Sequence, residues 1–499
     1  MKILLVYPPF CTPASPPYSI TSLYAFLKKN IKDELEVLDL NIEFHKRKFG
    51  KYMKFYQNIN LDDYDRVTDE YGKLTKKTYS ESNKKVVDGK KPELFNELLT
   101  EIIDINPDIA AFSIVYSSQA FYAYSLIKEL KRIGIKTVIG GPAVNQKLTT
   151  IADKSLRNEI ELIEYIKCQE FSIQSMTGGK LCVYSSNSCQ KIPEHAQEPP
   201  DALNDFNIPP VCDWRFLTDK KSNHKDLNFD TVLDFKIYKL NDYFVPEAVI
   251  PIRTSSSCYY RQCTFCTHYS NIAYFEFPLD NIKKNITASK AKFIFFTDDM
   301  IHKKRLLEIA QILKPLNVSW MCQLRPIKEL DYPTLKTLHE SGLRMIIWGV
   351  ESGCDRILKL MRKGTNKNNI IEVLKDSHDA GIKNIVYIMF GFPTETKEEF
   401  IETIEFLKQN SQNIDLVSTS VFGLQKGTPI YNNPEEFGIK EIISDKRTIL
   451  EPKISYKVHK GLTQQEAVRL RENYKKTIEK INKYPKAMNF FREHMLFMG

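Results

Sequence analysis

Three of the 10 cysteines of this chain lie within residues 258–266, in the order Cys258-Tyr-Tyr-Arg-Gln-Cys263-Thr-Phe-Cys266. Three thiolates this close together can ligate three irons of a cubane [4Fe-4S] cluster and leave the fourth iron without a protein ligand. A small molecule can then bind that iron directly, which is useful to a redox enzyme. The segment therefore predicts an iron–sulfur site with Cys258, Cys263 and Cys266 as the metal ligands.

Two other uses of these cysteines are weighed against the cluster. A zinc site usually takes four ligands in two spaced pairs, and no second CxxC pair is present, although His268 is a candidate fourth ligand. A disulfide is disfavoured because the sequence shows no secretion signal and a reducing cytosol keeps thiols free. The cluster remains the favoured interpretation.

Length and composition are those of a globular protein of two or three domains. The chain has 499 residues, of which 42% are hydrophobic and 27% charged. No apolar run approaches the ~20 residues of a membrane span, so we expect a cytoplasmic protein without membrane contact. The formal net charge of +9 is mild for this length. It favours a solvated lysine-rich surface over a site for an acidic substrate, and nucleic acid is an unlikely partner.

From residue 246 to 430, apolar strands alternate strictly with amphipathic helices, which predicts a partial (β/α)6 TIM-type barrel. The expected strands are Val249–Arg253, Lys292–Thr297, Val318–Leu324, Met345–Val350, Asn384–Phe390 and Ile414–Val421. The expected helices are Leu279–Ser289, Lys303–Leu313, Tyr332–Glu340, Asn368–Ala380 and Lys397–Asn410. Polar residues follow the strand ends, where barrel enzymes place their sites. These residues are Asp298 and Asp299, Arg325, Glu351 and Ser352, and the run from Gly391 to Glu395.

Residues 1–155 predict a Rossmann-like open parallel sheet, because strands again alternate with helices. The strands are Lys2–Tyr7, Leu35–Leu40, Pro107–Ile114 and Lys136–Ile139, and the helices are Ser19–Lys29 and Ala120–Arg132. No GxGxxG sequence is present, which disfavours an ordinary dinucleotide fold. An insertion at about 43–93 is rich in Lys and Tyr. We interpret it as a solvated helix pair or a lid, in preference to a surface for nucleic acid or peptide.

Two further regions carry no recognisable chemistry. Residues 156–245 are expected to be a linker region, with a proline-rich part at 192–210 and strands at Glu161–Glu170, Lys180–Ser185 and Val232–Tyr238. Residues 431–499 are expected to be a C-terminal helical region with one strong helix, Thr463–Asn482. The bulky apolar residues from Phe490 to Met498 either dock on the barrel or close the site, and docking is the favoured interpretation.

The barrel region resembles the radical S-adenosylmethionine (SAM) superfamily. The resemblance covers about residues 246 to 430 and lies in the cysteine segment, Gly349-Val-Glu-Ser-Gly353, Asp355-Arg-Ile-Leu-Lys-Leu-Met-Arg-Lys-Gly364 and Phe390-Gly-Phe-Pro-Thr-Glu395. One departure concerns the family spacing CxxxCxxC, because here four residues separate Cys258 from Cys263. We expect the extra residue to bulge the loop without removing a ligand.

The resemblance implies a [4Fe-4S] cluster whose open iron is chelated by SAM. One electron then cleaves SAM to methionine and a 5′-deoxyadenosyl radical, which abstracts a hydrogen atom from an unreactive C–H bond. The implied SAM contacts are Asp298 and Asp299 on the amino group, Glu351 and Ser352 on the ribose, and Gly391, Phe392 and Pro393 on the adenine. Arg325 is the expected partner of the SAM carboxylate, and Phe265 is expected to pack beside the cluster. Plainer roles are a helix cap for Asp298, a surface ion pair for Arg325 and a chain turn for Gly391.

The N-terminal half is similar to a cobalamin-binding domain at three strand ends. These are Leu5-Val-Tyr-Pro-Pro-Phe10 with Pro16-Pro17, Pro107-Asp-Ile-Ala-Ala-Phe-Ser113 and Val138-Ile-Gly-Gly-Pro-Ala143. The resemblance implies cobalamin as a further cofactor. The DxHxxG sequence of the lower cobalt ligand is absent, the turn expected near residues 163–170 is not recognisable, and the helix after it is not predicted.

Together these features predict a radical SAM enzyme with a cobalamin-domain-like N-terminal half and a C-terminal helical tail. The favoured reaction is cobalamin-dependent C-methylation of a small molecule or peptide, with a one-electron donor such as flavodoxin or ferredoxin. Without cobalamin, a radical cyclisation, rearrangement or crosslink is favoured. A methylthiotransferase acting on tRNA or a ribosomal protein would need three more N-terminal cluster cysteines, and the polar rim argues against a non-catalytic cluster-binding sensor.

Overall fold

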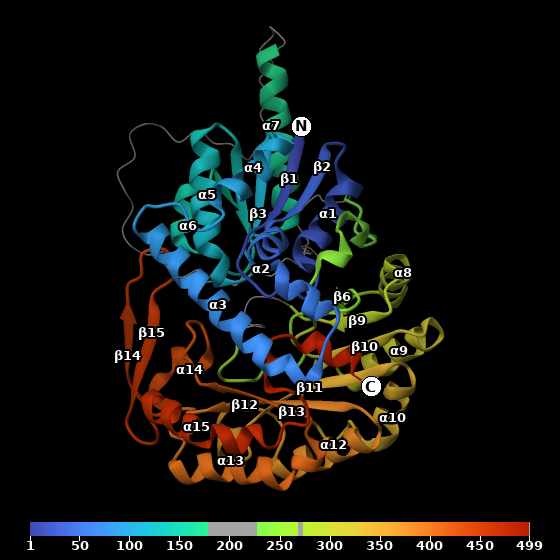
Figure 1. The fold of residues 1–499 in the computed structure, drawn as a ribbon, viewed down its shortest axis with the longest axis vertical. Coiled ribbons are helices and arrows are strands. Elements are labelled where there is room, and N and C mark those ends of the chain that lie inside the picture. The colour runs from blue at the N-terminus through green and yellow to red at the C-terminus, as the bar shows by residue number, and fades with distance from the viewer. Residues whose placement is uncertain (178–226, 268–272, 499) are drawn as a thin grey trace.

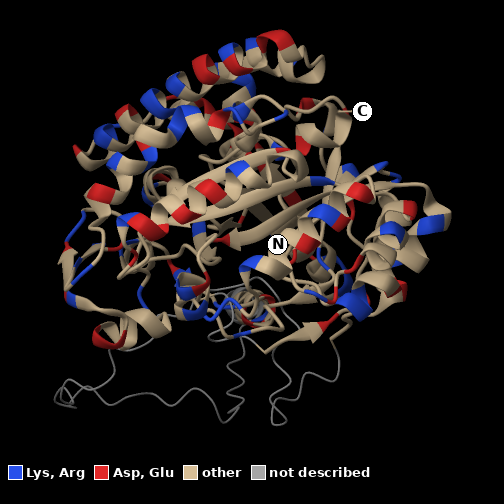
Figure 2. Ribbon diagram, turned by 90° about the horizontal axis from the view of Figure 1, so that it is seen from below, with Lys and Arg blue, Asp and Glu red and all other residues tan. Residues whose placement is uncertain are grey.

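Two parallel β-sheets lie one above the other in the computed structural model, with the N-terminal sheet on top in Figure 1. The structure describes residues 1–177, 227–267 and 273–498. Within these ranges, no helix combines the length and the apolar character needed to cross a membrane. Basic and acidic residues are interspersed along the helices in Figure 2. The basic residues are therefore not gathered on one element in that view.

The N-terminal sheet has five parallel strands in the order β2-β1-β3-β4-β5. Its strands are β1 (Lys2–Tyr7), β2 (Glu34–Asp39), β3 (Ile109–Ser113), β4 (Lys136–Gly140) and β5 (Lys154–Ser155). Its helices are α1 (Tyr18–Asn30), α4 (Phe95–Ile105), α5 (Ala120–Arg132), α6 (Gln146–Ile151) and α7 (Glu159–Thr177). The central strands are buried on both faces because helices cover the sheet from both sides. The strand order reverses between β1 and β3, and in such sheets the ligand lies beyond the carboxyl ends at this point. The predicted open α/β sheet is confirmed.

The strand predicted at Glu161–Glu170 is wrong, because this segment lies inside helix α7. Ile160, Ile163 and Ile166 recur at three-residue spacing and are buried, so they form the inner stripe of a helix. The helix follows β5 directly, and it is therefore the helix that the sequence did not predict after the fifth strand. The other predicted elements of this region, at 180–185 and 192–210, lie outside the described residues.

The insertion forms a helix pair, α2 (Leu40–Gln57) and α3 (Leu61–Val87), and α3 runs down across the front of the molecule in Figure 1. The pair is not solvated all round. Its inner side is a buried aromatic cluster, and the two helices are held over the barrel by it. The cluster includes Tyr52, Tyr56, Tyr64, Tyr71, Phe44 and Phe49.

The strand predicted at Val232–Tyr238 is also wrong. The segment has no strand and contains a short 3-10 turn, η3 (Phe235–Ile237), followed by η4 (Leu240–Asp242). Asp234 caps the first turn by accepting a hydrogen bond from the Lys236 N–H at 3.1 Å. Leu233 and Phe235 are both buried against the helices of the barrel region.

The second sheet has six parallel strands in the order β13-β12-β11-β10-β9-β6, which confirms the partial barrel. Its strands are β6 (Val249–Ile252), β9 (Phe293–Phe296), β10 (Ser319–Leu324), β11 (Leu343–Glu351), β12 (Lys383–Phe390) and β13 (Leu416–Val421). The connecting helices are α8 (Leu279–Ser289), α9 (Lys303–Leu313), α10 (Tyr332–Glu340), α11 (Asp355–Leu360), α12 (Lys367–Asp379) and α13 (Lys397–Gln409). The helices cover the outer face, where Trp320 and Trp348 are fully buried.

The inner face of this sheet is covered by the C-terminal tail, which we define as residues 486–498. The tail contains the turns η8 (Lys486–Asn489) and η9 (Arg492–Phe497). Phe491 and Met495 share one buried cluster with Met321 and Met345 of β10 and β11. The rings of Phe293 and Phe497 lie 4.4 Å apart between centroids. The tail therefore docks into the interior of the barrel.

Before the tail, the chain forms a hairpin that the sequence did not predict, followed by helix α15 (Gln464–Glu479). The hairpin strands are β14 (Ile439–Asp445) and β15 (Lys453–Val458), and they pair antiparallel at the edge of the molecule in Figure 1. Most residues of β14 are partly or fully exposed. The hairpin shares the buried cluster of Phe392 and Phe422 through Ile439 and Tyr456. It therefore packs beside the carboxyl ends of β12 and β13.

Asn384 at the start of β12 joins four parts of the barrel. The side-chain oxygen Oδ1 accepts a hydrogen bond from Trp348 Nε1 at 2.7 Å. The side-chain nitrogen Nδ2 donates to the backbone carbonyls of Leu374 and Asn413 at 2.9 and 2.8 Å. We expect Asn384→Leu to lower the free energy of unfolding by about 3 kcal/mol or more, because three buried polar groups lose their partner. Urea unfolding of the apoprotein measures this. Asn368→Leu, at an exposed position of α12, is the control, and equal losses in both variants would contradict the assignment.

Candidate functional site

The cysteine loop begins directly after β6, at the carboxyl edge of the barrel sheet. It is tied down at two places, since strand β7 (Ser255–Ser256) pairs with β8 (Phe275–Glu276) and the Thr264 N–H donates to the Met361 carbonyl at 3.0 Å. Cys258, Cys263 and Cys266 are partly exposed. Arg261, between the first two cysteines, has a φ of 53°. The loop thus turns sharply between Cys258 and Cys263.

The three thiols of this loop are the donor set for which a cluster was predicted. Among the residues that the structure describes, no three His, Cys, Asp or Glu side chains are close enough together to hold one metal ion. A zinc ion requires such a group, whereas a cubane cluster binds each thiolate at a separate iron. The proposed fourth zinc ligand, His268, lies outside the described residues.

The two acids after β9 have different surroundings. The Asp298 carboxylate is buried and accepts hydrogen bonds from the backbone and hydroxyl groups of Thr254 and Ser255, at 2.6–3.1 Å. Burial raises its pKa, although Arg253 and these donors oppose the rise. Asp298 therefore fixes the start of the cysteine loop. The Asp299 side chain keeps 24% of its surface exposed and lies 3.9 Å from Arg253, so it is the acid that a ligand can reach.

Arg325, at the end of β10, is buried with its guanidinium stacked on Tyr260 of the cysteine loop. The Cζ atom lies 3.5 Å from the ring centroid, and Nη1 donates to the Lys363 carbonyl at 3.1 Å. Its Nε atom is buried and has no hydrogen-bond partner among the described residues. Gly364 permits this arrangement, because a Cβ atom there would lie 2.3 Å from the Tyr260 hydroxyl. Arg325 is thus held in place, and its Nε–H group remains as a hydrogen-bond donor without a described partner.

Glu351 forms a nearly buried ion pair with a residue that the sequence analysis missed. Lys363 Nζ lies 2.8 Å from Glu351 Oε1, and their side chains are only 6% and 15% exposed. The ammonium also lies 5.8 Å from the ring centroid of Phe265. Lys363 sits in the quoted stretch 355–364, but a lysine after a short helix is usually solvated, so nothing in the sequence indicates its burial.

The remaining predicted contacts are engaged within the protein. The buried Ser352 hydroxyl lies 3.2 Å from that of Thr403 and accepts from the Cys354 N–H at 3.1 Å. Gly391 has a φ of 71°, and its backbone carbonyl accepts the Tyr456 hydroxyl at 3.2 Å. Phe392 and Pro393 are buried. The structure therefore brings Asp299, Arg325, Glu351 and Phe265 around the cysteine loop, while Asp298, Ser352 and Gly391 support neighbouring backbone.

A second candidate site is the carboxyl edge of the N-terminal sheet, which carries the loops after β1, β3 and β4. Gln119 joins the first two loops, because its amide donates to the Pro8 carbonyl at 2.7 Å and accepts from the backbone of Val115 and Tyr116. A small cleft opens beside these loops between α1, β3, β4 and the start of α7. It is lined by Leu23, Ser113, Val138, Gly140, Gly141, Asn158 and Leu162, among others.

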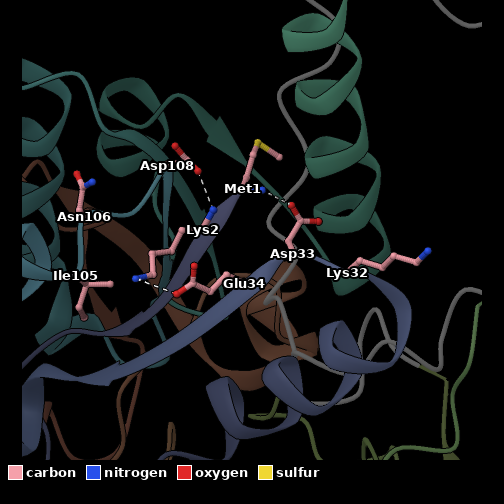
Figure 3. Close-up of a pocket in the computed structure, with 8 residues that line it drawn as sticks. All are labelled: Met1, Lys2, Lys32, Asp33, Glu34, Ile105, Asn106 and Asp108. Atoms are coloured by element: carbon pink, nitrogen blue, oxygen red, sulfur yellow. Dashed lines mark hydrogen bonds and ion pairs between the residues drawn. The ribbon is translucent and has the colours of Figure 1, made fainter.

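The surface hollow in Figure 3 lies at the opposite edge of the same sheet. It is lined by Lys2, Asp33, Glu34, Asp108 and their neighbours at the amino ends of the strands. The terminal ammonium of Met1 pairs with Asp33 at 2.8 Å, and Lys2 pairs with Glu34 at 3.0 Å. In parallel α/β sheets, ligands bind at the carboxyl ends of the strands. We therefore assign no function to this hollow.

Comparison with known proteins agrees with the geometry. The Radical SAM superfamily matches residues 252–407, and 31 curated proteins and 73 solved chains show significant similarity. The uncharacterized methyltransferase PH0819 of Pyrococcus horikoshii is 24% identical over 373 residues, which cover 70% of this chain and 74% of the relative.

Two solved structures share the fold over nearly the whole chain. The radical SAM methyltransferase TsrM of Kitasatospora setae, with cobalamin and a [4Fe-4S] cluster bound, has a TM-score of 0.55 at 15% identity and covers 90% of this chain and 82% of its own. The cobalamin-dependent radical SAM enzyme OxsB, with aqua-cobalamin bound, has a TM-score of 0.59 at 15% identity over 99% of this chain and 72% of its own.

Residues 252–407 thus form a radical SAM domain. The N-terminal sheet and the barrel have the fold of the cobalamin-dependent members of that superfamily.

Glu395, after β12, allows a test of the loop that follows this strand. Its buried carboxyl accepts a hydrogen bond from the Gly391 N–H. Burial raises its pKa from 4.5 to about 8, Glu399 adds to the rise, and Arg356 opposes it. The folded protein then retains a proton that the unfolded chain has lost, so stability falls as pH rises from about 4.5 to about 8.

We expect Glu395→Gln to remove this fall, because the amide keeps the acceptor for Gly391 and does not titrate. Relative to the wild type, the variant should gain on the order of 3 kcal/mol at pH 7 and nothing near pH 4.5. Urea unfolding between pH 5 and 8 measures the difference. Glu398→Gln, at an exposed position of α13, should follow the wild type. Parallel curves for wild type and Glu395→Gln would contradict the prediction.

Proposed function

We propose that this enzyme uses a [4Fe-4S] cluster, SAM and cobalamin to methylate an unactivated carbon of a small molecule or peptide. The proposal rests on the position of the cysteine loop relative to the N-terminal sheet. A three-cysteine loop lies at the carboxyl edge of the barrel, and a cobalamin-domain-like sheet lies above it. When bound, the cluster supplies the electron that cleaves SAM, and cobalamin supplies the methyl group. The protein's own residues hold these groups and keep water away.

The cysteine loop is proposed as the cluster site, with Cys258, Cys263 and Cys266 as ligands. Phe265 is partly buried beside Lys363 and limits access of water to that side of the loop. Burial raises the pKa of Cys263, Cys258 and Glu351 add to the rise, and the charges of Lys363 and Arg325 oppose it. The two cations thus partly offset the cost of forming the thiolate that iron requires.

SAM is proposed to lie between Asp299, Arg325 and Glu351. The spare Nε donor of Arg325 suits the SAM carboxylate, because a guanidinium binds a carboxylate through a charge-assisted bond. Asp299 provides an accessible carboxylate for the amino group. Glu351 remains the candidate for the ribose hydroxyls, oriented by Lys363. The residues from Gly391 to Pro393 are proposed to shape the adenine side through their backbone.

Cobalamin is proposed to lie over the loops after β1, β3 and β4, at residues 8–17, 113–119 and 140–145. These loops are held together by Gln119 and by the Ser118 hydroxyl, which donates to the Phe10 carbonyl at 2.6 Å. The cleft at Ser113, Gly140 and Gly141 offers room for a substituent on the lower face of the corrin. The partner that supplies the electron is proposed to be a small carrier such as flavodoxin or ferredoxin in the cytoplasm.

Replacing any one of Cys258, Cys263 and Cys266 by Ala should abolish the cluster while leaving the fold intact, since the loop lies outside the barrel core. Iron, sulfide and Mössbauer analysis of anaerobically reconstituted protein provides the measurement. Cys168→Ala, at an exposed position of α7, should keep a full cluster. A full [4Fe-4S] complement in all three loop variants would refute the assignment.

Protein produced with hydroxocobalamin should carry corrin absorbance, and Ser113→Leu should reduce it about tenfold by filling the cleft. Thr150→Leu, at an exposed position of α6, should bind like the wild type. The visible spectrum after removal of free corrinoid gives the occupancy. A wild-type protein without corrin absorbance at saturating corrinoid would exclude the cobalamin-dependent reaction, and cyclisation, rearrangement or crosslinking would then be the function to test.

A further inference from the structure

The C-terminal tail brings two charged residues, Arg492 and Glu493, to the interior of the barrel. Arg492 Cζ lies 5.3 Å from the centroid of the Tyr387 ring on β12. Tyr387 is two residues from Ile385, which is buried in the cluster that contains the tail, so both side chains point to the inner face. Arg492, Glu493 and Tyr387 each keep part of their surface accessible.

Neither charge forms an ion pair with a described residue, although burial raises the pKa of Glu493 and the Arg492 charge opposes that rise. Arg492 makes no ion pair or hydrogen bond with any residue in the described ranges, and its guanidinium packs on the Tyr387 ring. Glu493 makes no ion pair there either, with Arg492 or with any other described cation. The Tyr387 hydroxyl and Asn489 Oδ1 are buried and have no hydrogen-bond partner among described residues. Unused polar groups of this kind favour a bound polar ligand.

The two charges also face the N-terminal sheet. Tyr116, in the loop after β3, is 53% exposed. The Glu493 charge acts to raise the pKa of its hydroxyl, and the Arg492 charge acts to lower it. Both tail charges therefore lie near the loops proposed to carry the corrin. They stand between the two edges of the proposed active site, on the inner side of the barrel, where a substrate must lie to meet both.

We propose that Arg492, positioned by stacking on Tyr387, binds an anionic group of the substrate, either a carboxylate or a phosphate. This inference rests on the proposed function and deepens it by naming the class of substrate. The guanidinium presents several donors in a plane that suits either anion, and the Tyr387 hydroxyl adds a further donor beside it. Glu493 opposes the anion by its charge and thereby limits how tightly the group is held.

Labelling with phenylglyoxal tests the site in the full chain without knowledge of the substrate. Arg492 should react, and sodium acetate or sodium phosphate should slow its reaction relative to sodium chloride at equal ionic strength. Peptide mass spectrometry measures each arginine separately. Arg469, at an exposed position of α15, should react without protection. Protection by acetate identifies a carboxylate site, and protection by phosphate alone identifies a phosphate site.

Two variants separate an anion site from a structural anchor of the tail. Arg492→Gln should weaken anion-dependent thermal stabilisation by about tenfold in apparent affinity, because a charge-assisted contact is lost. Glu493→Gln should strengthen it, because the opposing charge is removed. An anchor would show the reverse, with both variants destabilised and no change in anion response. Failure of both anions to protect Arg492, or weaker binding in Glu493→Gln, overturns the inference.

The labelling uses no SAM and no reductant, so it reports on anion binding alone. Loss of the cluster or of corrin binding would contradict the proposed function without affecting the labelling. Anion protection that persists in a protein without a cluster would support the site, and would leave the radical reaction to be judged by its own experiments.

Discussion

A six-stranded parallel sheet cannot close into a barrel, so its inner face must be covered by other parts of the chain. The sheet ends at β6 and β13, and residues from both ends of the sequence cover it. His494 of the tail lies 2.6 Å from the Tyr64 hydroxyl of α3 and 2.7 Å from the Phe244 carbonyl. The barrel interior, the insertion helices and the tail therefore share one core, and neither half of the chain buries its apolar surface alone.

The carboxyl edge of the barrel gathers buried charges, which are costly unless each has a partner. Lys363 is neutralised by Glu351, Arg325 stacks on Tyr260, and Asp298 receives donors from the cysteine loop. Each of these contacts also fixes a backbone segment next to the loop. The contacts that compensate these buried charges are therefore the same contacts that fix the shape of the loop.

Most of the fold could be predicted because the helices have one buried face and the strands are apolar. Helices α8, α9 and α10 begin and end at the predicted residues. The segment around Ile163 was misjudged because a short apolar stretch fits both a strand and a buried helix. The hairpin of β14 and β15 was missed because its exposed strands lack strict alternation. The roles of Asp298 and Lys363 depend on contacts across 44 and 12 residues, which local patterns do not reveal.

The docking of residues 486–498 inside the barrel has a consequence for biosynthesis. These residues leave the ribosome after both sheets and the cysteine loop have been made. Until they dock, the interior between Met321, Met345 and the aromatic faces of α2 and α3 lacks the side chains that complete its core. The nascent chain therefore passes through a stage with an open barrel.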